Sequence, residues 1–372
     1  MPAVARCPLK PCVNSFLPIY KYHCQMNRLL LIILLDPDTY IYIGWAVLTL
    51  LSLLLAWLFF RRRHSSHLVP RTSHLVPRTS HLVPRTSLFL LALAWAVFLY
   101  GTYIGFSQLE VRHIELAFDD LPPSFDGYKI VQFSDVHAGT MTGRRRHLLE
   151  EAIDSINAQQ ADMVVFTGDL QNIVPEEIEP VADLLSSVKA RDGVFSVLGN
   201  HDYPMYFKGD EFEKYEKMGL RMNIDEQLGW TLLVNERRFI RRGNERIVIG
   251  GMDNDGATER FPQNGDVQQT LFGVRLHDFI VMLEHDPTAW RRKILPHSHT
   301  QLTLSGHTHG GQVSLFGWTP ASITYHESRG LYQAGKRYLY VNSGLGGVVP
   351  FRLGTPAEIV VITLRRNEIM KE

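Results

Sequence analysis

Gly306-His307-Thr308-His309-Gly310-Gly311 is the stretch from which the organisation of this chain can be deduced. It places two imidazoles one residue apart, within a run of small residues that lets backbone come close to a bound ion. An isolated pair of this kind can equally be a polar turn or the two faces of a strand. A shared metal site is the better interpretation because four similar clusters closely follow apolar runs upstream: Asp135-Val136-His137, Gly168-Asp169, Gly199-Asn200-His201-Asp202 and Glu284-His285-Asp286-Pro287.

The chain from about Asp126 onward alternates short apolar runs with helical patterns, which is typical of an α/β domain. Helices are predicted at 144–160 and 178–189. Strands are predicted at 128–133, 163–167, 194–198, 230–235, 246–250, 279–283, 302–305, 338–342 and 358–364. Because the C-terminal half is richer in strands than in helices, we expect two β-sheets packed face to face with helices outside.

The candidate ligands fall at the ends of predicted strands: Asp135, Asp169, Asn200, His285 and His307. Ligands of open α/β sheets gather beyond the carboxyl ends of the strands, so these side chains should meet. Oxygen and imidazole donors without thiolate suit Mn, Fe or Zn. A carboxylate bridging two such ions about 3.5 to 4 Å apart would clamp a phosphoryl group and lower the pKa of a bound water. The donor set therefore predicts phosphate ester hydrolysis.

Taken in order, these clusters resemble the five motifs of the calcineurin-like metallophosphoesterases: Asp135-x-His137, Gly168-Asp169-x-x-Asn172, Gly199-Asn200-His201-Asp202, His285 and Gly306-His307-x-His309. The resemblance covers roughly residues 125 to 365. It implies a four-layer α/β/β/α sandwich that holds two divalent metal ions. The segment Asn342-Ser343-Gly344-Leu345-Gly346 looks like the bacterial branch of the family, which often carries an amino-terminal membrane anchor.

The resemblance implies a role for each matching residue. One metal is expected on Asp135, His137, Asp169 and His309. The second is expected on Asp169, Asn200, His285 and His307, with Asp169 bridging the two ions. His201 would lie just outside the metals, where it could steady a phosphoryl oxygen or protonate the leaving group while a metal-bound hydroxide attacks phosphorus in line. Asp202 is expected to orient His201 by accepting its other N–H.

Other polar residues are interpreted without a catalytic role. We expect a solvated loop at His297 and His299, and a turn at Asp253-Asn254-Asp255, which lacks the spacing of a calcium loop. Arg352 could meet a substrate phosphate or be a surface charge. Residues 203–228 could form a lid or an ordinary connecting helix.

The N-terminal part of the chain predicts a membrane anchor. Residues 1–39 are expected to be a leader that contains a short apolar stretch. Two uncharged runs, 40–60 and 88–106, are each long enough to span a bilayer as a helix. We therefore expect residues 40–106 to anchor the protein through two transmembrane helices.

The loop between these two runs contains Arg61-Arg62-Arg63 and three copies of Ser-His-Leu-Val-Pro-Arg-Thr at 66–86. A proline in every copy forbids a coiled coil, so the repeat is interpreted as a lengthened loop. Short Arg-rich loops stay on the cytoplasmic side. Residues 107–124 would then be a linker, and residues 125–372 a catalytic domain on the outer face of a bacterial inner membrane.

The composition narrows the function further. Lys plus Arg equals Asp plus Glu at 38 each, so a nucleic-acid partner is not expected. The three cysteines all lie in the first 24 residues, which excludes a thiolate metal site in the main domain. No pattern indicates an oligomeric state.

We expect the protein to hydrolyse a phosphodiester or pyrophosphate bond. The anchor favours a lipid-linked or envelope substrate, such as the nucleotide-activated glycolipid pyrophosphates that some relatives hydrolyse. Cyclic nucleotides and simple phosphodiesters, on which other relatives act, are the alternatives. A non-enzymatic membrane binding module on the same fold is the rival class, and the intact ligand set argues against it.

Overall fold

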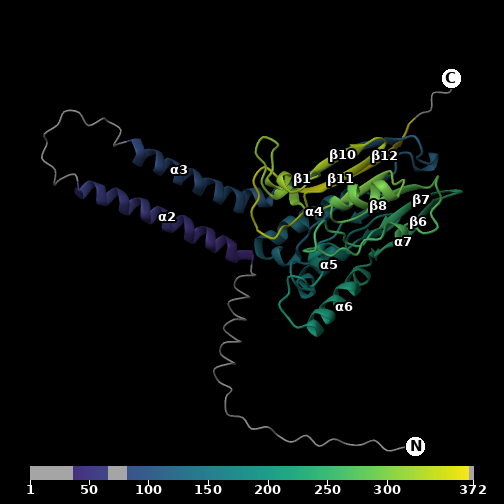
Figure 1. Cartoon of the computed structure of the whole chain (residues 1–372), viewed down its shortest axis with the longest axis horizontal. Helices are drawn as coiled ribbons and strands as arrows, with labels where there is room; N and C mark the ends of the chain where they lie inside the picture. The colour runs from purple at the N-terminus through teal and green to yellow at the C-terminus, as the bar shows by residue number, and fades with distance from the viewer. Residues whose placement is uncertain (1–36, 66–81, 368–372) are drawn as a thin grey trace, which may run out of the picture.

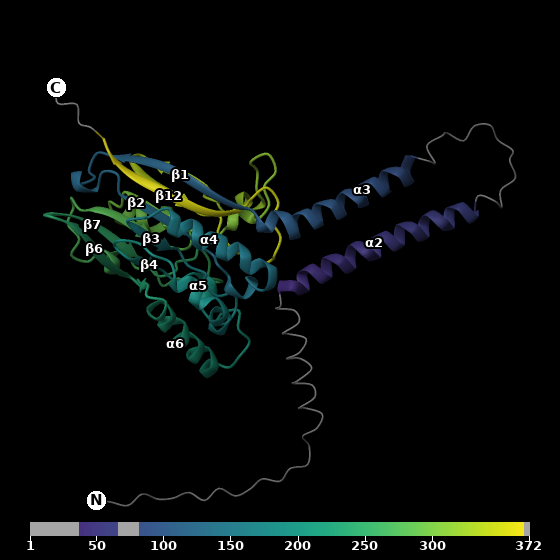
Figure 2. The same cartoon turned by 180° about the vertical axis from the view of Figure 1, so that it is seen from behind.

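The computed structural model describes residues 37–65 and 82–367, in which a pair of apolar helices leads into an α/β domain (Figures 1 and 2). The expected leader, with its apolar stretch, lies almost entirely outside the described residues. So do most of the heptapeptide repeats, although the last five repeat residues, 82–86, begin a helix.

The two apolar helices, α2 (Pro37–Ser65) and α3 (Leu82–Leu99), lie side by side and form what we call the helix pair (Figure 1). Thr39–Leu58 and Thr86–Ser107 are long and apolar enough to cross a membrane, judged by length and composition. The helices contact each other through an edge-on aromatic pair with ring centroids 4.8 Å apart, Trp45 and Trp95. The expected apolar segments are therefore helices of suitable length.

The first sheet has six strands in the order β1-β12-β2-β3-β4-β5. In that order the strands are Leu109–Phe118, Ala357–Arg366, Lys129–Phe133, Met163–Phe166, Val194–Ser196 and Thr231–Leu232. β2 to β5 run parallel to one another, whereas β12 runs antiparallel to β2 and parallel to β1. The carboxyl ends of β2, β3 and β4 therefore meet at one edge of the sheet.

The second sheet has six strands in the order β10-β11-β9-β8-β7-β6. In that order the strands are Gly330–Ala334, Arg337–Val341, Leu302–Ser305, Phe279–Leu283, Glu245–Gly251 and Glu236–Arg242. The four central strands are parallel, and each edge strand is antiparallel to its neighbour.

Alternating side chains build a separate apolar core on each face of the sheets. Along β2, Ile130 belongs to the core between the two sheets, whereas Val131 belongs to the core on the outer face of the first sheet. α4 (Arg146–Ala158) and α5 (Ala182–Ser186) cover that outer face. On the far side of the second sheet, Trp290 completes a third core. The expected sandwich of two sheets flanked by helices is confirmed.

The remaining helices connect these layers. Three are short or peripheral α-helices: α6 (Glu211–Gln227), α7 (Val267–Thr270) and α8 (Leu295–His297). Two are π-helical turns, η2 (Tyr100–Ile104) and η9 (Trp290–Ile294). The others are 3-10 turns: η3 (Gly105–Ser107), η4 (Pro123–Phe125), η5 (Ala138–Thr140), η6 (Gly143–Arg145), η7 (Pro175–Val181), η8 (Asn200–Asp202), η10 (His309–Gly311) and η11 (Pro320–Ile323).

The structure differs from the sequence-based expectation in several segments, among them 178–189 and 107–124. The helix expected at 178–189 is a 3-10 turn followed by a five-residue α-helix, because Pro180 has no N–H and breaks α-helical hydrogen bonding. Residues 107–124, expected to be a linker, contain the ten-residue strand β1, which pairs with β12 along its whole length. The sheet domain therefore begins well before residue 125.

The helix pair joins the sheet domain closely. η2 and η3 follow α3 directly, and only Gln108 separates η3 from β1. Phe106 is fully buried in the core beneath the first sheet. The backbone N–H of Arg352 donates a hydrogen bond of 3.0 Å to the carbonyl of Gly101. The ring of Phe351 packs on Gly101 so closely that a Cβ there would lie 2.2 Å from it.

Candidate metal centre

The structure brings the seven expected ligands together beyond the strand ends of both sheets. Three strands of the first sheet, β2, β3 and β4, and two of the second, β8 and β9, lead into them. The residues that follow these strands are Asp135, His137, Asp169, Asn200, His285, His307 and His309. Six of the seven, all but Asn200, belong to overlapping groups whose ligand atoms lie within 4.8 Å of one another. Asp169 forms one group with His285 and His307 and another with His137 and His201.

The first group contains Asp135, His137 and His309. His309 Nε2 lies 3.2 Å from His137 Nε2 and 3.5 Å from Asp135 Oδ1. His137 Nδ1 lies 3.3 Å from the side-chain oxygen of Asn172, an acceptor that places the ring proton on Nδ1. His137 Nε2 therefore presents a lone pair to the cluster, as a metal ligand must.

The second group contains Asp169, His285 and His307, with Asn200 between the two imidazoles. Asn200 Oδ1 lies 3.2 Å from His285 Nε2 and 2.7 Å from His307 Nδ1. Asp169 Oδ2 lies 3.2 Å from His285 Nε2 and 3.6 Å from His137 Nε2. One carboxylate oxygen thus faces imidazoles from both groups, which suits a bridging ligand.

The backbone around these ligands is held in unusual conformations. Five of the seven have positive φ values, a region that costs energy for a residue with a side chain. These residues are Asp135, His137, Asp169, His307 and His309. Neighbouring glycines allow the close approach, since a Cβ on Gly199 would lie 2.2 Å from Asp169 Oδ1. Strain concentrated at one cluster is typical of a functional site.

Charge at the centre is set by burial and by Asp169. Burial lowers the pKa of His137 to about 3 and that of His307 to about 4, so both imidazoles are neutral at pH 7. Burial also opposes a charge on His285, but the Asp169 carboxylate raises the pKa of His285 to about 10. Burial would raise the pKa of Asp169, yet His285 and His201 hold it well below its ordinary value.

The residues fit a pair of divalent cations. Neutral imidazoles, carboxylates and an amide oxygen converge without any thiolate, which is the donor chemistry of Mn, Fe or Zn. His285 keeps a proton opposite Asp169 in the absence of metal, and a cation would take the place of that proton.

His201 lies beside both groups, because it is close to His137 of the first and Asp169 of the second. Its Nδ1 lies 2.6 Å from the carbonyl oxygen of Asn172, which can only accept, so Nδ1 carries a proton. Its ring stacks on Tyr206 with centroids 4.1 Å apart. The remaining nitrogen, Nε2, is therefore the one available for proton transfer.

The expectation that Asp202 orients the His201 ring requires correction. The Asp202 carboxylate accepts hydrogen bonds from four backbone N–H groups, those of Asp169, Leu170, Gln171 and Gly199. It also accepts one from Arg221 Nε at 2.8 Å. The Asp202 carboxylate is thus occupied by the ligand loops and by Arg221, and the carbonyl of Asn172 accepts the hydrogen bond from His201 instead.

Sequence reasoning did not assign three residues that border the centre: Asn172, Tyr206 and Tyr325. Asn172 was visible in the motif that contains Asp169, and its side-chain oxygen contacts His137. The hydroxyl of Tyr325 lies 2.8 Å from His307 Nε2, and that of Tyr206 lies 3.0 Å from the Asn200 amide nitrogen. The two tyrosines follow no motif, so only the tertiary structure identifies them.

The other polar residues singled out in the sequence do not join the centre. Arg352 is fully buried and donates to backbone carbonyls, so it is neither a surface charge nor a phosphate ligand. Asp253 accepts from the hydroxyl of Tyr203, and Asp255 forms ion pairs with Arg292 and Lys293. Asp253 therefore contributes to a buried turn and not to a calcium loop.

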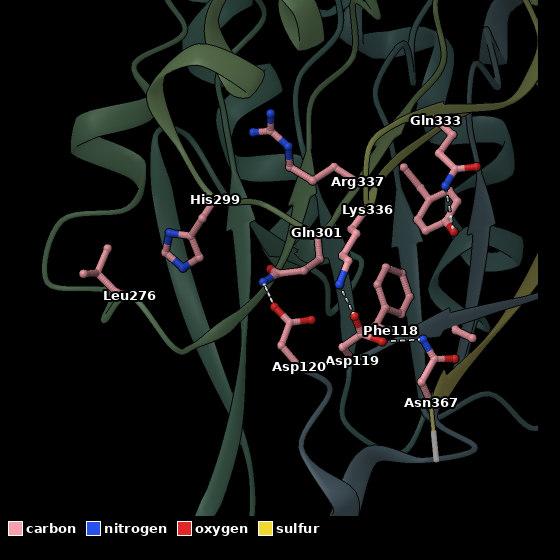
Figure 3. Close-up of a pocket in the computed structure, with 12 residues that line it drawn as sticks. Phe118, Asp119, Asp120, Leu276, His299, Gln301, Gln333, Lys336, Arg337 and Asn367 are labelled. Carbon is pink, nitrogen blue, oxygen red and sulfur yellow. Dashed lines mark hydrogen bonds and ion pairs between the residues drawn. The ribbon is translucent and has the colours of Figure 1, made fainter. Parts of the chain in front are cut away.

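A cavity lies away from these ligands, at the opposite ends of β9 and β11 (Figure 3). It measures about 500 Å³, and His299 is among the residues that line it. Its polar side chains pair with one another, as Gln301 does with Asp120 and Lys336 with Asp119. The cavity offers no cluster of metal-ligand type, so the chemistry lies at the strand ends.

Comparisons with known proteins agree with this site. Residues 128–311 match the family model described as calcineurin-like phosphoesterase. Over 274 residues the chain is 30% identical to the uncharacterized metallophosphoesterase YkuE of Bacillus subtilis, which covers 72% of this chain and 89% of that protein. It is 28% identical over 262 residues to an uncharacterized metallophosphoesterase of Aquifex aeolicus, covering 69% of this chain and 92% of that protein.

A third relative is named as a transmembrane protein. The chain is 29% identical over 274 residues to the transmembrane protein with metallophosphoesterase domain of Danio rerio, and the match covers 72% of this chain. The chain spans only 60% of the length of that protein. Fold, donor set and relatives together define a metal-dependent phosphoester hydrolase. The chain belongs to the calcineurin-like phosphoesterase family.

Proposed function

We propose that this protein is a membrane-anchored enzyme that uses two divalent ions, Mn, Fe or Zn, to hydrolyse a phosphodiester or pyrophosphate bond of a lipid-linked substrate. The observation that carries the two-metal proposal is the position of Asp169 Oδ2, which faces an imidazole of each ligand group. Two bound ions would supply a water of lowered pKa and neutralise charge on the phosphoryl group.

The protein residues have separate tasks in this proposal. Asp169 holds the two ligand groups in register, and Asn200 aligns two imidazoles of the second group. His201, fixed by the Asn172 carbonyl, presents Nε2 to the leaving group. When protonated, that nitrogen donates its proton to the departing oxygen. General acid catalysis of this kind typically raises the rate about 10²–10⁴-fold.

The proposal of a lipid-linked substrate is supported by the short path from the metal centre to the helix pair. The N–H of Gly346 donates to the carbonyl of Asp135 at 2.7 Å, and Arg352, six residues further on, bonds to Gly101 beside α3. A ligand loop and the end of an apolar helix are thus joined by one short segment. A phosphoester in a lipid headgroup would lie within reach of such a site.

The proposed orientation places the catalytic domain on the outer face of a bacterial inner membrane. It is supported by the arginines between the two apolar helices, since Arg-rich short loops stay in the cytoplasm. Protease added to intact spheroplasts should therefore digest the catalytic domain. Protection of the domain until the membrane is permeabilised would reverse the orientation.

The experiment that tests the enzyme uses the full chain in detergent micelles. Metal content is measured by mass spectrometry, and rates are measured on a soluble aryl phosphodiester and on a lipid with a nucleoside diphosphate headgroup. The site variants are Asn200→Ala and His201→Ala. The matched controls are two exposed residues of the same types, Asn223→Ala and His147→Ala.

About two ions per chain are expected, as a dinuclear site requires. Asn200→Ala should lose metal and activity together. His201→Ala should keep its metal and lose about 10²–10⁴-fold in kcat. The controls should match the parent protein. A folded chain that binds no metal would refute the two-metal proposal, and cleavage of the soluble diester alone would refute the lipid substrate.

A further inference from the structure

An exposed apolar loop continues directly from the motif that carries His307 and His309. It comprises residues 315–323, which we call the 315–323 loop. Four of its large side chains are exposed to solvent: Leu315, Phe316, Trp318 and Ile323. Phe316 is fully exposed, and Ile323 is 77% exposed. Exposed clusters of large apolar side chains typically mark sites of contact with a partner or a membrane, because exposing apolar area to water is unfavourable.

The tip of this loop is held in a defined shape. Leu315 and Trp318 exchange two backbone hydrogen bonds of 2.9 and 3.0 Å, which close a two-residue turn. Both turn residues have positive φ, 52° at Phe316 and 83° at Gly317. Glycine adopts this conformation freely, but a bulky aromatic residue rarely does. The backbone therefore accepts strain while it holds a phenyl ring away from the domain.

Hydrogen bonds connect the loop to the helix pair. The N–H of Ser314 donates to the carbonyl of Leu353 at 2.7 Å, and the N–H of Leu353 donates to Gln312. The preceding residue, Arg352, bonds to Gly101 at the end of α3. Figures 1 and 2 both show yellow-green loops at the end of the domain where α3 enters. The loop thus belongs to the face of the domain nearest the apolar helices.

The π-helical turn η2, which directly follows α3, carries exposed aromatic and aliphatic side chains. Tyr100, Tyr103 and Ile104 of η2 are all exposed. Tyrosine and tryptophan are enriched where membrane proteins meet the headgroup region, because their rings are partly apolar and partly polar. Trp318 and these tyrosines are therefore side chains of the kind that suits a bilayer surface.

We propose that the 315–323 loop inserts into the headgroup and upper acyl region of the bilayer that α2 and α3 cross. The inference rests on the membrane anchoring given under the proposed function. The loop is tied to the metal centre, since Thr319 Oγ donates to the carbonyl of Gly310 at 2.5 Å. Insertion beside His309 would bring the phosphate of a lipid headgroup to the ligands while its acyl chains stay in the bilayer.

Site-directed spin labelling of the full chain tests this proposal. Cys7, Cys12 and Cys24 are replaced by serine, and one cysteine is introduced per variant: Phe316→Cys, Ile323→Cys, Leu276→Cys or Leu93→Cys. Leu276 is an equally exposed apolar residue beside the distant cavity, and it serves as the matched control. Leu93 lies in α3 and reports on the helix pair. The labelled chains are reconstituted in vesicles of phosphatidylethanolamine and phosphatidylglycerol.

The depth of each label in the bilayer is then obtained from its collision frequencies with two relaxation reagents, molecular oxygen, which concentrates in lipid, and a nickel complex, which stays in water. Labels at 316 and 323 should lose most of their collisions with nickel and gain collisions with oxygen, whereas the label at 276 should remain aqueous. An aqueous label at 316 together with a lipid-exposed label at 93 overturns the loop proposal and leaves the anchor intact. Aqueous labels at both positions overturn the anchor as well.

A second copy of the chain is the other possible occupant of this surface. Contact between two 315–323 loops would broaden the spectrum of the Phe316→Cys label through spin–spin coupling, and dilution with unlabelled protein would remove the broadening. That result would overturn the bilayer proposal. A companion measurement uses Phe316→Asp, which should keep its rate on a soluble diester and lose rate on the lipid substrate in vesicles.

Discussion

Asp202 shows how a residue next to the ligands can act on them without touching a metal. Its carboxylate joins the loop after β3 to the loop after β4, through the N–H groups of Asp169 and Gly199. Arg221 of α6 neutralises it and bonds in turn to Asp225. All three charged side chains are completely buried. The loops that carry two candidate metal ligands, Asp169 and Asn200, are therefore held by one buried ion network.

Replacing Asp202 by Asn tests this role. The side-chain amide of Asn would direct N–H groups at backbone N–H groups that now donate to the Asp202 carboxylate. Arg221 would lose one of its two carboxylate partners. Breaking one partner of a buried ion pair costs about 3–5 kcal/mol, so the free energy of unfolding should fall by that amount. Urea unfolding of the metal-free chain measures it. The exposed Asp154→Asn is the control and should change stability by at most about 0.5 kcal/mol. Equal stability of the two variants would contradict this role.

At the residue scale, the sequence predicted which candidate ligands come together but not the residues that support them. Asp135, His137 and His309 are recognisable because metal chemistry requires their side chains at short spacings after strands. Asp202 stands in the same motif as His201, yet its contacts depend on how two loops turn toward each other. Arg352 was misjudged for a similar reason, because a buried arginine bonded to backbone carbonyls has no local signature.

At the scale of elements, the loop from β11 to β12 positions the first ligand group. Arg352 Nη1 and Nη2 together donate to five backbone carbonyls of this loop, at Ser343, Gly344, Gly346, Thr355 and Pro356. The N–H of Gly346 in turn donates to the carbonyl of Asp135. One buried guanidinium therefore fixes a loop that supports a metal ligand.

Arg352→Met keeps the volume of the side chain but removes all of these donors. The buried carbonyls would be left without partners, so the loop should rearrange and release Asp135. Loss of groups that orient metal ligands typically lowers metal affinity about 10–100-fold, and we expect a decrease of that size. Titration with Mn²⁺ followed by calorimetry measures it. Arg365→Met, on the exposed side of β12, should bind metal normally. Unchanged affinity in Arg352→Met would show that the loop does not support the site.

Strand prediction succeeded in the interior of the sheets but missed three of the four edge strands. β8 and β9 lie where they were expected, because both faces of a central parallel strand are buried and the strand reads as an apolar run. The three strands that were not predicted, β1, β6 and β10, are all edge strands. β6 reads Glu-Arg-Arg-Phe-Ile-Arg-Arg, and such charge protects an exposed edge from pairing with other chains. Charged edge strands resemble loops in a sequence.

At the scale of the whole molecule, the second apolar segment, Thr86–Ser107, ends inside the core of the sheet domain. Phe106 lies at the end of the second apolar segment, yet it is fully buried among residues of the first sheet and α4. The sequence assigned Phe106 to the membrane because its composition matches that of the preceding residues. Apolar periodicity cannot distinguish lipid from protein interior.

Phe106→Ala should therefore destabilise the catalytic domain and not merely the helix pair. Large-to-small changes of a buried phenylalanine cost about 3–5 kcal/mol. Thermal unfolding of the full chain, followed by loss of phosphodiesterase activity after heating, measures the change. Leu99→Ala, at an exposed position on α3, is the control and should leave inactivation unchanged. Equal inactivation temperatures for both variants would show that the domain is independent of this residue.

The single residue between η3 and β1 also has a kinetic consequence. In the proposed arrangement, with the chain anchored in a bilayer and a lipid-linked substrate, the metal centre would stay at one height and meet substrate only by lateral diffusion. Its turnover then follows the mole fraction of substrate in the surface, and diluting the vesicles in buffer leaves the rate per enzyme unchanged. Adding inert lipid spreads the same substrate over a larger area, so it lowers the turnover of each enzyme. A longer, flexible tether would relax this dependence on surface composition.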